Sequence, residues 1–438
     1  MKTQPDIHKA IVGGLIVIAT IALTSRPASA QIEFDPPALY AVETFPTSVT
    51  AAELNGDGHL DLAVTNEVSN TVTLLFNDGQ GGFGTTDSFE TGFDTGPFAL
   101  AAGDFDGDGD NDLAVVNKDE NSVSVHLNNG AGIFTLDVTL AVGDTPRSIA
   151  VGDLNHDNQP DIVVANRDSN DVSVFLNLGG GKFGPAVNYA AGEDLRQIVI
   201  GLLDNDEHPD IAVTSHDTIS VGILLNTGTG EFNPVTQLFL GGGDRPEALA
   251  LGDLNGDGYP DLAVGVSGDF SGSIEILENN GNGLFSTMTS LPASIDVAAI
   301  QVGDLNGDGM RDLAAADRIG DTISTYENLG AGQFGTRATI DVAPNPYYMR
   351  LGDFAGNGLC DDIAIPNSES NQVTVLISQA VAACLADMSG DGTVDAADLA
   401  ELLGAWGPNP GHPADFNGDG VVNAADLAQL LGAWGACP

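Results

Sequence analysis

The stretch Asp104-Phe-Asp106-Gly-Asp108-Gly-Asp110-Asn-Asp112 decides the fold, because close copies of it recur about every 50 residues along the chain. Two further clear copies begin at Asp253 and Asp304. The other four copies begin at Glu53, Asp153, Leu202 and Asp353. A fixed period of this length indicates supersecondary units that stack against one another. The sequence therefore predicts seven such units.

Each repeat has the pattern of four short antiparallel strands. In the third repeat we expect strands at residues 148–152, 161–165 and 172–176, then a glycine-rich turn at 179–183 and a fourth strand at 186–190. Short β-branched runs between Gly, Asn and Asp are typical of hairpins. Four strands per repeat without a helical period predict an all-β fold, a seven-bladed β-propeller. The composition excludes a helical solenoid, and a β-solenoid would need much shorter repeats.

The two ends of the repeat region complement each other. The seventh repeat stops after residues 372–377 and lacks the glycine-rich turn and the fourth strand. The segment that runs from Phe34 to Tyr40 matches the segment from Phe183 to Tyr189 in the third repeat. We therefore expect the N-terminal segment to supply the outer strand of the seventh blade, which would cover an otherwise open sheet edge.

The recurring phrase is also a metal-binding pattern. Oxygen-bearing side chains at positions 1, 3, 5 and 9, with glycine at position 6, allow a short loop to wrap a hard cation such as Ca²⁺. By its number of carboxylates the second loop is the best site, followed by the fifth and the sixth. The ligands expected in these loops are Asp104, Asp106, Asp108, Asp110 (through its carbonyl), Asp112, Asp253, Asn255, Asp257, Asp261, Asp304, Asn306, Asp308 and Asp312.

The other four loops depart from this pattern. The third has His156 and Asn158 where most copies have glycine, which predicts a strained turn. The first begins with the longer Glu53, and the fourth has Leu202 at position 1. The ligands expected here are Glu53, Asn55, Asp57, Asp61, Asp153, Asn155, Asp157, Asp161, Asp204, Asp206 and Asp210. The seventh loop is expected to bind weakly or not at all, because it holds Asp353, Ala355, Asn357 and an extra residue near Asp361-Asp362.

Ordinary polar turns are the alternative explanation of these loops, since Asp, Asn and Gly dominate turns. One such loop would leave that alternative open, but several near-complete copies favour the binding of several calcium ions. Each ion would tie a hairpin and neutralise carboxylates that repel one another, so calcium should be linked to stability.

These repeats resemble the FG-GAP/VCBS repeats of integrin-α-like β-propellers. The resemblance covers residues 31–378 and includes the acidic phrase and the pairs Phe83-Gly84, Phe183-Gly184 and Phe334-Gly335. It implies that the acidic loop joins the first two strands of each blade and binds calcium. We accordingly expect a propeller domain over residues 31–379.

A second, shorter repeat occupies the C-terminal region. Two copies of a twelve-residue loop begin 28 residues apart, at Asp387 and Asp415. Ligands at positions 1, 3, 5, 7, 9 and 12 are those of an EF-hand loop, with Asp in place of the usual Glu at position 12. They are Asp387, Ser389, Asp391, Thr393, Asp395, Asp398, Asp415, Asn417, Asp419, Val421, Asn423 and Asp426. Each loop precedes an apolar helix face, formed in the first copy by Leu399, Leu402, Leu403 and Trp406.

Two loop–helix units in tandem resemble a type I dockerin, and the resemblance covers residues 384–438. It implies a protein partner, a cohesin-like domain, bound through positions 10 and 11 of each loop. These are Ala396-Ala397 and Ala424-Ala425, and their identity fits docking in either of two orientations. A paired EF-hand-like fold without a cohesin partner is the alternative.

The three cysteines leave two pairings open. Cys384 and Cys437 bracket the C-terminal module, so a disulfide between them would staple its ends and leave Cys360 free. A Cys360–Cys384 bridge is the competing pairing.

The first 30 residues have the pattern of a cleaved signal peptide. Lys2 and Lys9 precede the apolar run 11–23, and the small residues 28–30 form a cleavage site before Gln31. An uncleaved anchor is the alternative, but the run is short for a bilayer span. We expect a secreted or cell-surface protein without a transmembrane segment after cleavage. The net charge of −49 argues against nucleic-acid partners.

No catalytic motif stands out in the chain. The sequence has no Gly-x-Ser-x-Gly, His-Glu-x-x-His or P-loop motif, and its histidines are scattered. A carboxylate pair of a glycosidase would be hidden among the repeated acidic residues. Whether the chain is an enzyme therefore stays open. An enzyme of this architecture would be a hydrolase or lyase acting on polysaccharide.

Three functional hypotheses follow. The first is a secreted, calcium-binding, non-catalytic interaction or adhesion propeller that binds a protein or glycan and is attached to an extracellular partner through its dockerin-like module. The second is a polysaccharide-degrading component of an extracellular carbohydrate-active complex, which rests on association rather than on a site. The third is a structural component of the cell envelope.

Overall fold

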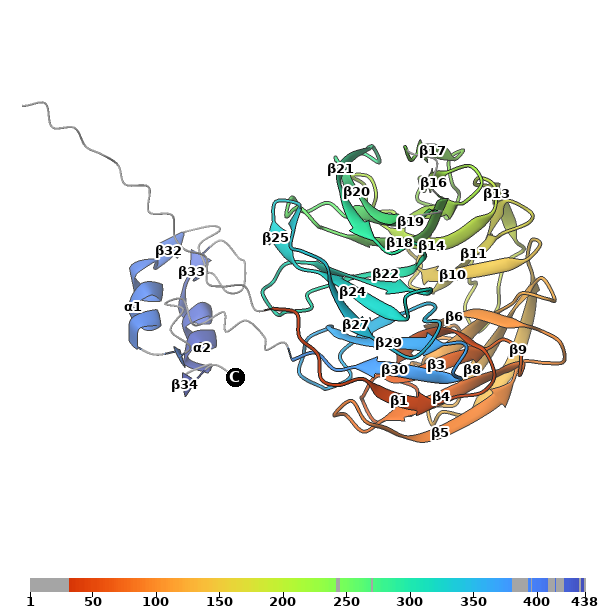
Figure 1. The fold of residues 1–438 in the computed structure, drawn as a ribbon, viewed down its shortest axis with the longest axis horizontal. Helices are drawn as coiled ribbons and strands as arrows, with labels where there is room; N and C mark the ends of the chain where they lie inside the picture. The colour runs from red at the N-terminus through yellow and green to blue at the C-terminus, as the bar shows by residue number, and fades with distance from the viewer. Residues whose placement is uncertain are drawn as a thin grey trace, which may run out of the picture.

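The computed structural model describes residues 31–241, 245–268, 271–379, 393–394, 396–408, 414, 421–432 and 435–436. Seven four-stranded antiparallel sheets are arranged in a ring in Figure 1. The prediction of an all-β seven-bladed propeller is thus confirmed. The signal-peptide prediction and the cysteines Cys384 and Cys437 lie outside the described residues, whereas Cys360 is exposed and carries a free thiol.

Each blade runs from the centre of the ring outward. The innermost strands are β2 (Pro46–Ala52), β6 (Pro97–Gly103), β10 (Pro146–Gly152), β14 (Leu195–Gly201), β18 (Arg245–Gly252), β22 (Val297–Gly303) and β28 (Arg350–Gly352). The second strands are β3 (Asp61–Asn66), β7 (Asp112–Asn117), β11 (Asp161–Asn166), β15 (Asp210–Ser215), β19 (Asp261–Ser267), β23 (Asp312–Asp317) and β29 (Asp362–Asn367).

The outer half of each blade completes the sheet. The third strands are β4 (Thr71–Asn77), β8 (Ser122–Asn128), β12 (Asp171–Phe175), β16 (Ser220–Leu224), β20 (Gly272–Asn279), β24 (Thr322–Tyr326) and β30 (Gln372–Leu376). The outermost strands are β5 (Phe83–Glu90), β9 (Phe134–Ala141), β13 (Val187–Ala190), β17 (Thr236–Phe239), β21 (Phe285–Ala293), β27 (Ala338–Asp341) and β1 (Ala38–Ala41). A small hairpin of β25 (Asn328–Gly330) and β26 (Gln333–Phe334) precedes β27.

The core lies between the blades. Second strands such as β7 are buried along their whole length, because a neighbouring blade covers each face of the sheet. Outer strands such as β1 alternate between half-buried and exposed residues, because their outer side meets solvent. The propeller has seven buried apolar clusters, and each joins two neighbouring blades. The chain therefore needs the complete ring to bury its apolar residues.

The N-terminal segment forms the outer strand of the seventh blade. Strand β1 pairs antiparallel with β30, with Tyr40 opposite Val373, and Phe34 bridges to Ser378 beyond the end of the strand. The Tyr40 ring packs edge-on against Phe83 of the first blade at 5.4 Å. The Tyr40 hydroxyl donates to the Gly81 carbonyl at 3.3 Å. The seam between the first and last blades is thus packed by side chains from both ends of the ring.

Replacement of Tyr40 by alanine is expected to destabilise this seam by about 2 kcal/mol, since the half-buried ring loses both its apolar burial and its aromatic contact. A thermal melt should show a Tm that is lower by a few degrees, while Tyr40→Phe, which keeps the ring, should lose less than half as much. Equal losses in the two variants would show that ring packing does not hold the seam.

The described part of the C-terminal module has a two-fold pattern. Strand β31 (Thr393–Val394) precedes helix α1 (Ala396–Gly404) and pairs with β34 (Gly435–Ala436), which follows helix α2 (Ala424–Gly432). Conversely, β33 (Val421–Val422) precedes α2 and pairs with β32 (Gly407–Pro408), which follows α1. Each loop–helix unit therefore completes the other. Within the described part of the chain, neither helix is long and apolar enough to span a bilayer.

Only half of the predicted apolar helix face is buried. Leu402 and Leu430 lie in the small core with Val422, and Leu399 and Leu427 pack against it. By contrast, Leu403 and Trp406 are 52% and 47% exposed, and the equivalent Leu431 is 53% exposed. This division of the face has a geometric cause, because each short helix can cover only one flank of the other.

Candidate metal-binding loops

All seven acidic loops join an inner strand to the second strand of the same blade, so they lie on one face of the ring. In the second blade the Asp104 carboxylate accepts hydrogen bonds from the backbone N–H groups of Gly107 (2.7 Å), Asp108 (3.1 Å) and Gly109 (3.0 Å). Gly107 and Gly109 have φ angles of 81° and 97°, a left-handed conformation that glycine adopts readily. The glycines thus let the loop curl around the first carboxylate.

Three carboxylates meet in this loop. One oxygen each of Asp104, Asp106 and Asp108 lies within 4.8 Å of the others. Loss of hydration raises the pKa of Asp106, and the charges of Asp108 and Asp104 raise it further. Such a set of hard oxygen ligands fits Ca²⁺, because a divalent cation would replace the repulsion by attraction.

Position 9 has a second role that the sequence did not reveal. Asp112 is fully buried, and its two oxygens accept hydrogen bonds from the N–H groups of Phe105 and Asn128, both at 2.8 Å. The carboxylate therefore braces the loop against the end of the third strand, and each oxygen keeps a lone pair for a cation. The same two bonds recur at Asp61, Asp161, Asp210, Asp261, Asp312 and Asp362.

These buried carboxyl groups have raised pKa values. Loss of hydration is the main cause, the backbone hydrogen bonds oppose it, and neighbouring carboxylates add to it. The pKa is raised to about 7 at Asp312. It is raised to about 6 at Asp61, Asp112, Asp161, Asp210 and Asp261.

The irregular loops show how their substitutions act. His156 and Asn158 have φ angles of 60° and 64°, so the third loop forces non-glycine residues into the left-handed region that glycine occupies in the second loop. In the fourth loop Leu202 is 46% exposed and offers no acceptor in place of the first carboxylate. In the seventh loop Asp362 takes the bracing role, and the inserted Asp361 is fully buried beside it.

The loop residues of the C-terminal module are only partly described. Asp387, Ser389, Asp391, Asp395, Asp415, Asn417 and Asp419 lie outside the described residues. Thr393 and Val421, at position 7, lie in the short paired strands. Asp398 and Asp426, at position 12, are fully buried. Asp426 also accepts a hydrogen bond from the backbone N–H of Asn423 at 2.8 Å, which caps the start of α2.

An asparagine side chain links each of several blades to the preceding blade, a contact that the sequence did not predict and that we call the asparagine clasp. Asn128 donates its side-chain amide to the Leu54 carbonyl in the loop of the preceding blade, at 2.9 Å, and to Asn111 in its own loop, at 3.0 Å. The bond between Asn77 and the Phe354 carbonyl, at 3.0 Å, closes the ring. The equivalent donors are Asn177, Asn226, Asn279, Asn328 and Ser378. The recurrence of asparagine at the end of the third strand in six of the seven blades was the available signal.

The opposite face carries an ion-pair network drawn from several repeats. Asp194 accepts from Arg196 at 2.7 Å and from Arg167 at 2.8 Å, and Nε2 of His216 lies 3.1 Å from Glu247. Burial would raise the pKa of Asp194, but the two guanidinium groups outweigh it and lower that pKa. Although Asp194, His216 and Asp217 converge, the pairing of Asp194 with two cations disfavours a metal ion there. These residues are far apart in sequence, so no local motif marks them.

Comparisons with known proteins agree with this geometry. The model of the FG-GAP-like repeat matches residues 53–115, 104–164 and 203–264, and that of the FG-GAP repeat matches residues 246–284. The model of the dockerin type I domain matches residues 385–432. No curated protein matches the chain in sequence.

Solved structures share the propeller fold at low sequence identity. Virginiamycin B lyase from Staphylococcus aureus is 13% identical, with a TM-score of 0.54, over 79% of this chain and 99% of that one. BBS1N, from its complex with ARL6DN, is 14% identical, with a TM-score of 0.56, over 80% of this chain and 97% of that one. An Agrocybe aegerita lectin that recognises terminal N-acetylglucosamine is 21% identical, with a TM-score of 0.51, over 68% of this chain and 80% of that one.

At identities this low, the solved structures show only that the fold is shared. The family is shown by the family models together with the geometry of the repeats. The combination of repeats is that of an extracellular protein-interaction module, and a type I dockerin implies a protein partner, typically a cohesin. The chain is an FG-GAP-repeat β-propeller protein with a C-terminal type I dockerin domain.

Proposed function

We propose that the chain is a secreted, calcium-binding, non-catalytic interaction propeller, attached to an extracellular protein through its dockerin module. In this proposal residues 1–30 are a leader, residues 31–379 the propeller and residues 384–438 the docking module. The observation that carries the docking role is the repeated, exposed apolar surface of the two helices.

The described part of that surface is nearly the same in both copies. Leu403 of α1 and Leu431 of α2 occupy equivalent positions and are 52% and 53% exposed. Ala396 and Ala424, at position 10 of the loops, are both exposed. An apolar partner surface would cover the leucines and gain burial energy. The equivalence of the two copies supports docking in either of two orientations.

The acidic loops support the calcium part of the proposal. Convergent carboxylates at Asp104, Asp106 and Asp108 need a counter-charge, and the chain has 62 acidic but only 13 basic residues. Type I dockerin domains bind calcium, so the same ion would organise both parts of the protein. Calcium binding would then make docking and stability depend on the same cation.

Two buried histidines support the non-catalytic part. His126 is buried beside Phe89 and shares a hydrogen bond with Ser124 at 3.0 Å. Burial lowers the pKa of His126 to about 4, so its ring is neutral and acts in packing. His216 is held between carboxylates of the ion-pair network. Both histidines therefore have structural roles.

Docking is tested with a panel of purified type I cohesin domains and surface-immobilised full-length protein in calcium. One cohesin should bind, and a chain that ends at Gln379 should not bind it. If docking uses either orientation, Leu403→Ala and Leu431→Ala alone should each weaken binding no more than about threefold, and together by at least about tenfold, roughly 1.4 kcal/mol.

The control is Leu178→Ala, which removes an exposed leucine (68%) from the propeller and should leave the affinity unchanged. Binding that survives removal of residues 380–438, or that survives chelation of calcium, would contradict the proposal. A double leucine variant with unchanged affinity would show that the helices do not form the docking surface.

A further inference from the structure

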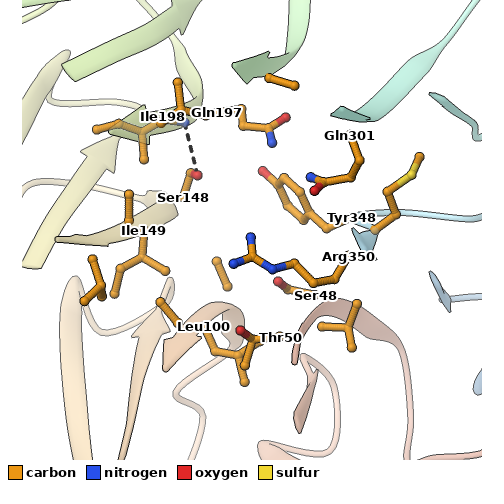
Figure 2. A pocket seen from close by; sticks show the side chains of 18 of the residues that line it. Ser48, Thr50, Leu100, Ser148, Ile149, Gln197, Ile198, Gln301, Tyr348 and Arg350 are labelled. Atoms are coloured by element: carbon orange, nitrogen blue, oxygen red, sulfur yellow. Dashed lines mark hydrogen bonds between the residues drawn. The ribbon is translucent and has the colours of Figure 1, made fainter. Parts of the chain in front are cut away.

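The centre of the ring is an open channel. The innermost strands of all seven blades line it, and its volume is about 380 Å³. In Figure 2, Tyr348, Gln301 and Arg350 extend into the channel from one side, and Ser148 and Ile149 lie across from them. At the repeat position equivalent to Arg350, five of the other inner strands carry smaller side chains that also line the channel. These are Thr50, Ala101, Ala150, Val199 and Ala250.

Arg350 is the arginine that lines the channel. Within the described residues its side chain has no ion pair and no hydrogen bond, whereas Arg196 and Arg318 each pair with a carboxylate at 2.7 and 2.8 Å. Loss of hydration lowers the pKa of Arg350, and the one titratable group that opposes this is the Cys360 thiol. A cation without a counter-charge therefore lines the channel, where solvent reaches its side chain, although the chain carries a net charge of −49.

Neutral polar groups surround this cation. No described residue forms a hydrogen bond with the Tyr348 hydroxyl or the Gln301 amide, and both face the channel in Figure 2. Burial raises the pKa of Tyr348, so its hydroxyl stays protonated and can donate. Leu100 and Ile149 add apolar wall. One cation, a few free polar groups and apolar walls are the usual composition of a small-molecule site.

We propose that the channel binds a small carboxylate that also carries hydroxyl groups, with its carboxylate paired to Arg350 and its hydroxyls bonded to Gln301 and Tyr348. The planar guanidinium fork matches a carboxylate through two parallel hydrogen bonds. The volume suits a molecule of about the size of one sugar unit rather than a polymer. The site lies in the propeller, so it is independent of the docking module.

The test is isothermal titration of the full-length protein, in calcium, with D-glucuronate and with D-glucose. The two probes have the same size and differ chiefly in one carboxylate. We expect saturable binding of glucuronate with a Kd of about 1 mM or tighter, about 4 kcal/mol, and at least about tenfold weaker binding of glucose. Arg350→Gln should weaken glucuronate binding by at least about tenfold, since it removes the charge.

Matched variants keep the test decisive. Arg337→Gln, which changes an arginine bound to Ser324 at 2.7 Å outside the channel, should leave glucuronate affinity unchanged. Gln301→Leu should weaken glucuronate binding by about fivefold while it keeps the charge of Arg350. This variant replaces Arg350→Gln in the test if Arg350→Gln lowers the Tm. Equal affinity for glucose, equal affinity for sulfate, or no heat up to about 10 mM glucuronate would each overturn the proposal.

Discussion

Chelation of calcium at pH 7.5 is expected to lower the Tm of the propeller by about 10 °C or more. Several loops would each lose roughly 2 to 3 kcal/mol of binding energy, because an ion that binds only the folded state stabilises it by mass action. The convergent carboxylates of loops such as Asp104–Asp108 would then repel one another across distances below 4.8 Å. Differential scanning calorimetry in calcium and in chelator measures this difference.

The pH dependence of the same melts should differ with and without calcium. The buried aspartates at position 9 have a folded pKa of about 6 against 3.8 without the fold, as at Asp112. A carboxyl group whose pKa is raised by folding contributes stability below its unfolded pKa, and this is lost as pH rises through the folded pKa. The calcium-free protein should therefore become more stable as pH falls from about 7.5 to about 5.5, while the calcium-bound protein gains nothing or loses stability.

Magnesium at the same concentration is the control for this experiment, since the smaller ion demands a stricter geometry and should restore only part of the Tm. Identical melting curves in calcium and in chelator would contradict calcium binding by the loops. A calcium-free protein that loses stability on mild acidification would show that the position-9 carboxylates are not the groups that titrate.

Asp112→Ala is expected to destabilise the propeller by about 3 kcal/mol both in calcium and in chelator. The substitution leaves the buried N–H groups of Phe105 and Asn128 without an acceptor, and each unsatisfied group costs about 1 to 3 kcal/mol. The Tm should fall by about 5 °C or more in either condition. The measurement is a pair of thermal melts, with and without calcium.

Asp108→Ala in the same loop is the matched control. Among the described residues its carboxylate accepts a hydrogen bond from the exposed N–H of Asp110 alone, at 3.0 Å, so its removal should matter chiefly to a bound cation. We expect a lower Tm in calcium and an unchanged or slightly higher Tm in chelator, since the substitution removes one of the carboxylates that repel one another. If Asp112→Ala left the Tm in chelator unchanged, the Asp112 carboxylate would act only as a metal ligand. Its hydrogen bonds to Phe105 and Asn128 would then not stabilise the fold.

In the docking module the local sequence pattern predicted the helix but not which of its apolar residues are buried. Spacing placed Leu399, Leu402, Leu403 and Trp406 on one helical face, and the helix is present. Which of these residues are buried depends on the second helix, which covers Leu402 and leaves Leu403 exposed. A periodic pattern identifies a face, but the partner that packs on it decides how much is covered.

By itself the sequence determined the seven-bladed ring and the positions of the acidic loops, because each copy of a repeat of fixed length folds into the same strand–loop–strand unit. Only the tertiary structure decided that Asp112 is a buried brace, that Asn128 clasps the preceding blade and that Arg350 stands unpaired in the channel. The physical reason is distance along the chain. The Asp112 brace depends on another strand of its own blade, and the Asn128 bond depends on the loop of the preceding blade. The place of Arg350 in the channel depends on closure of the ring.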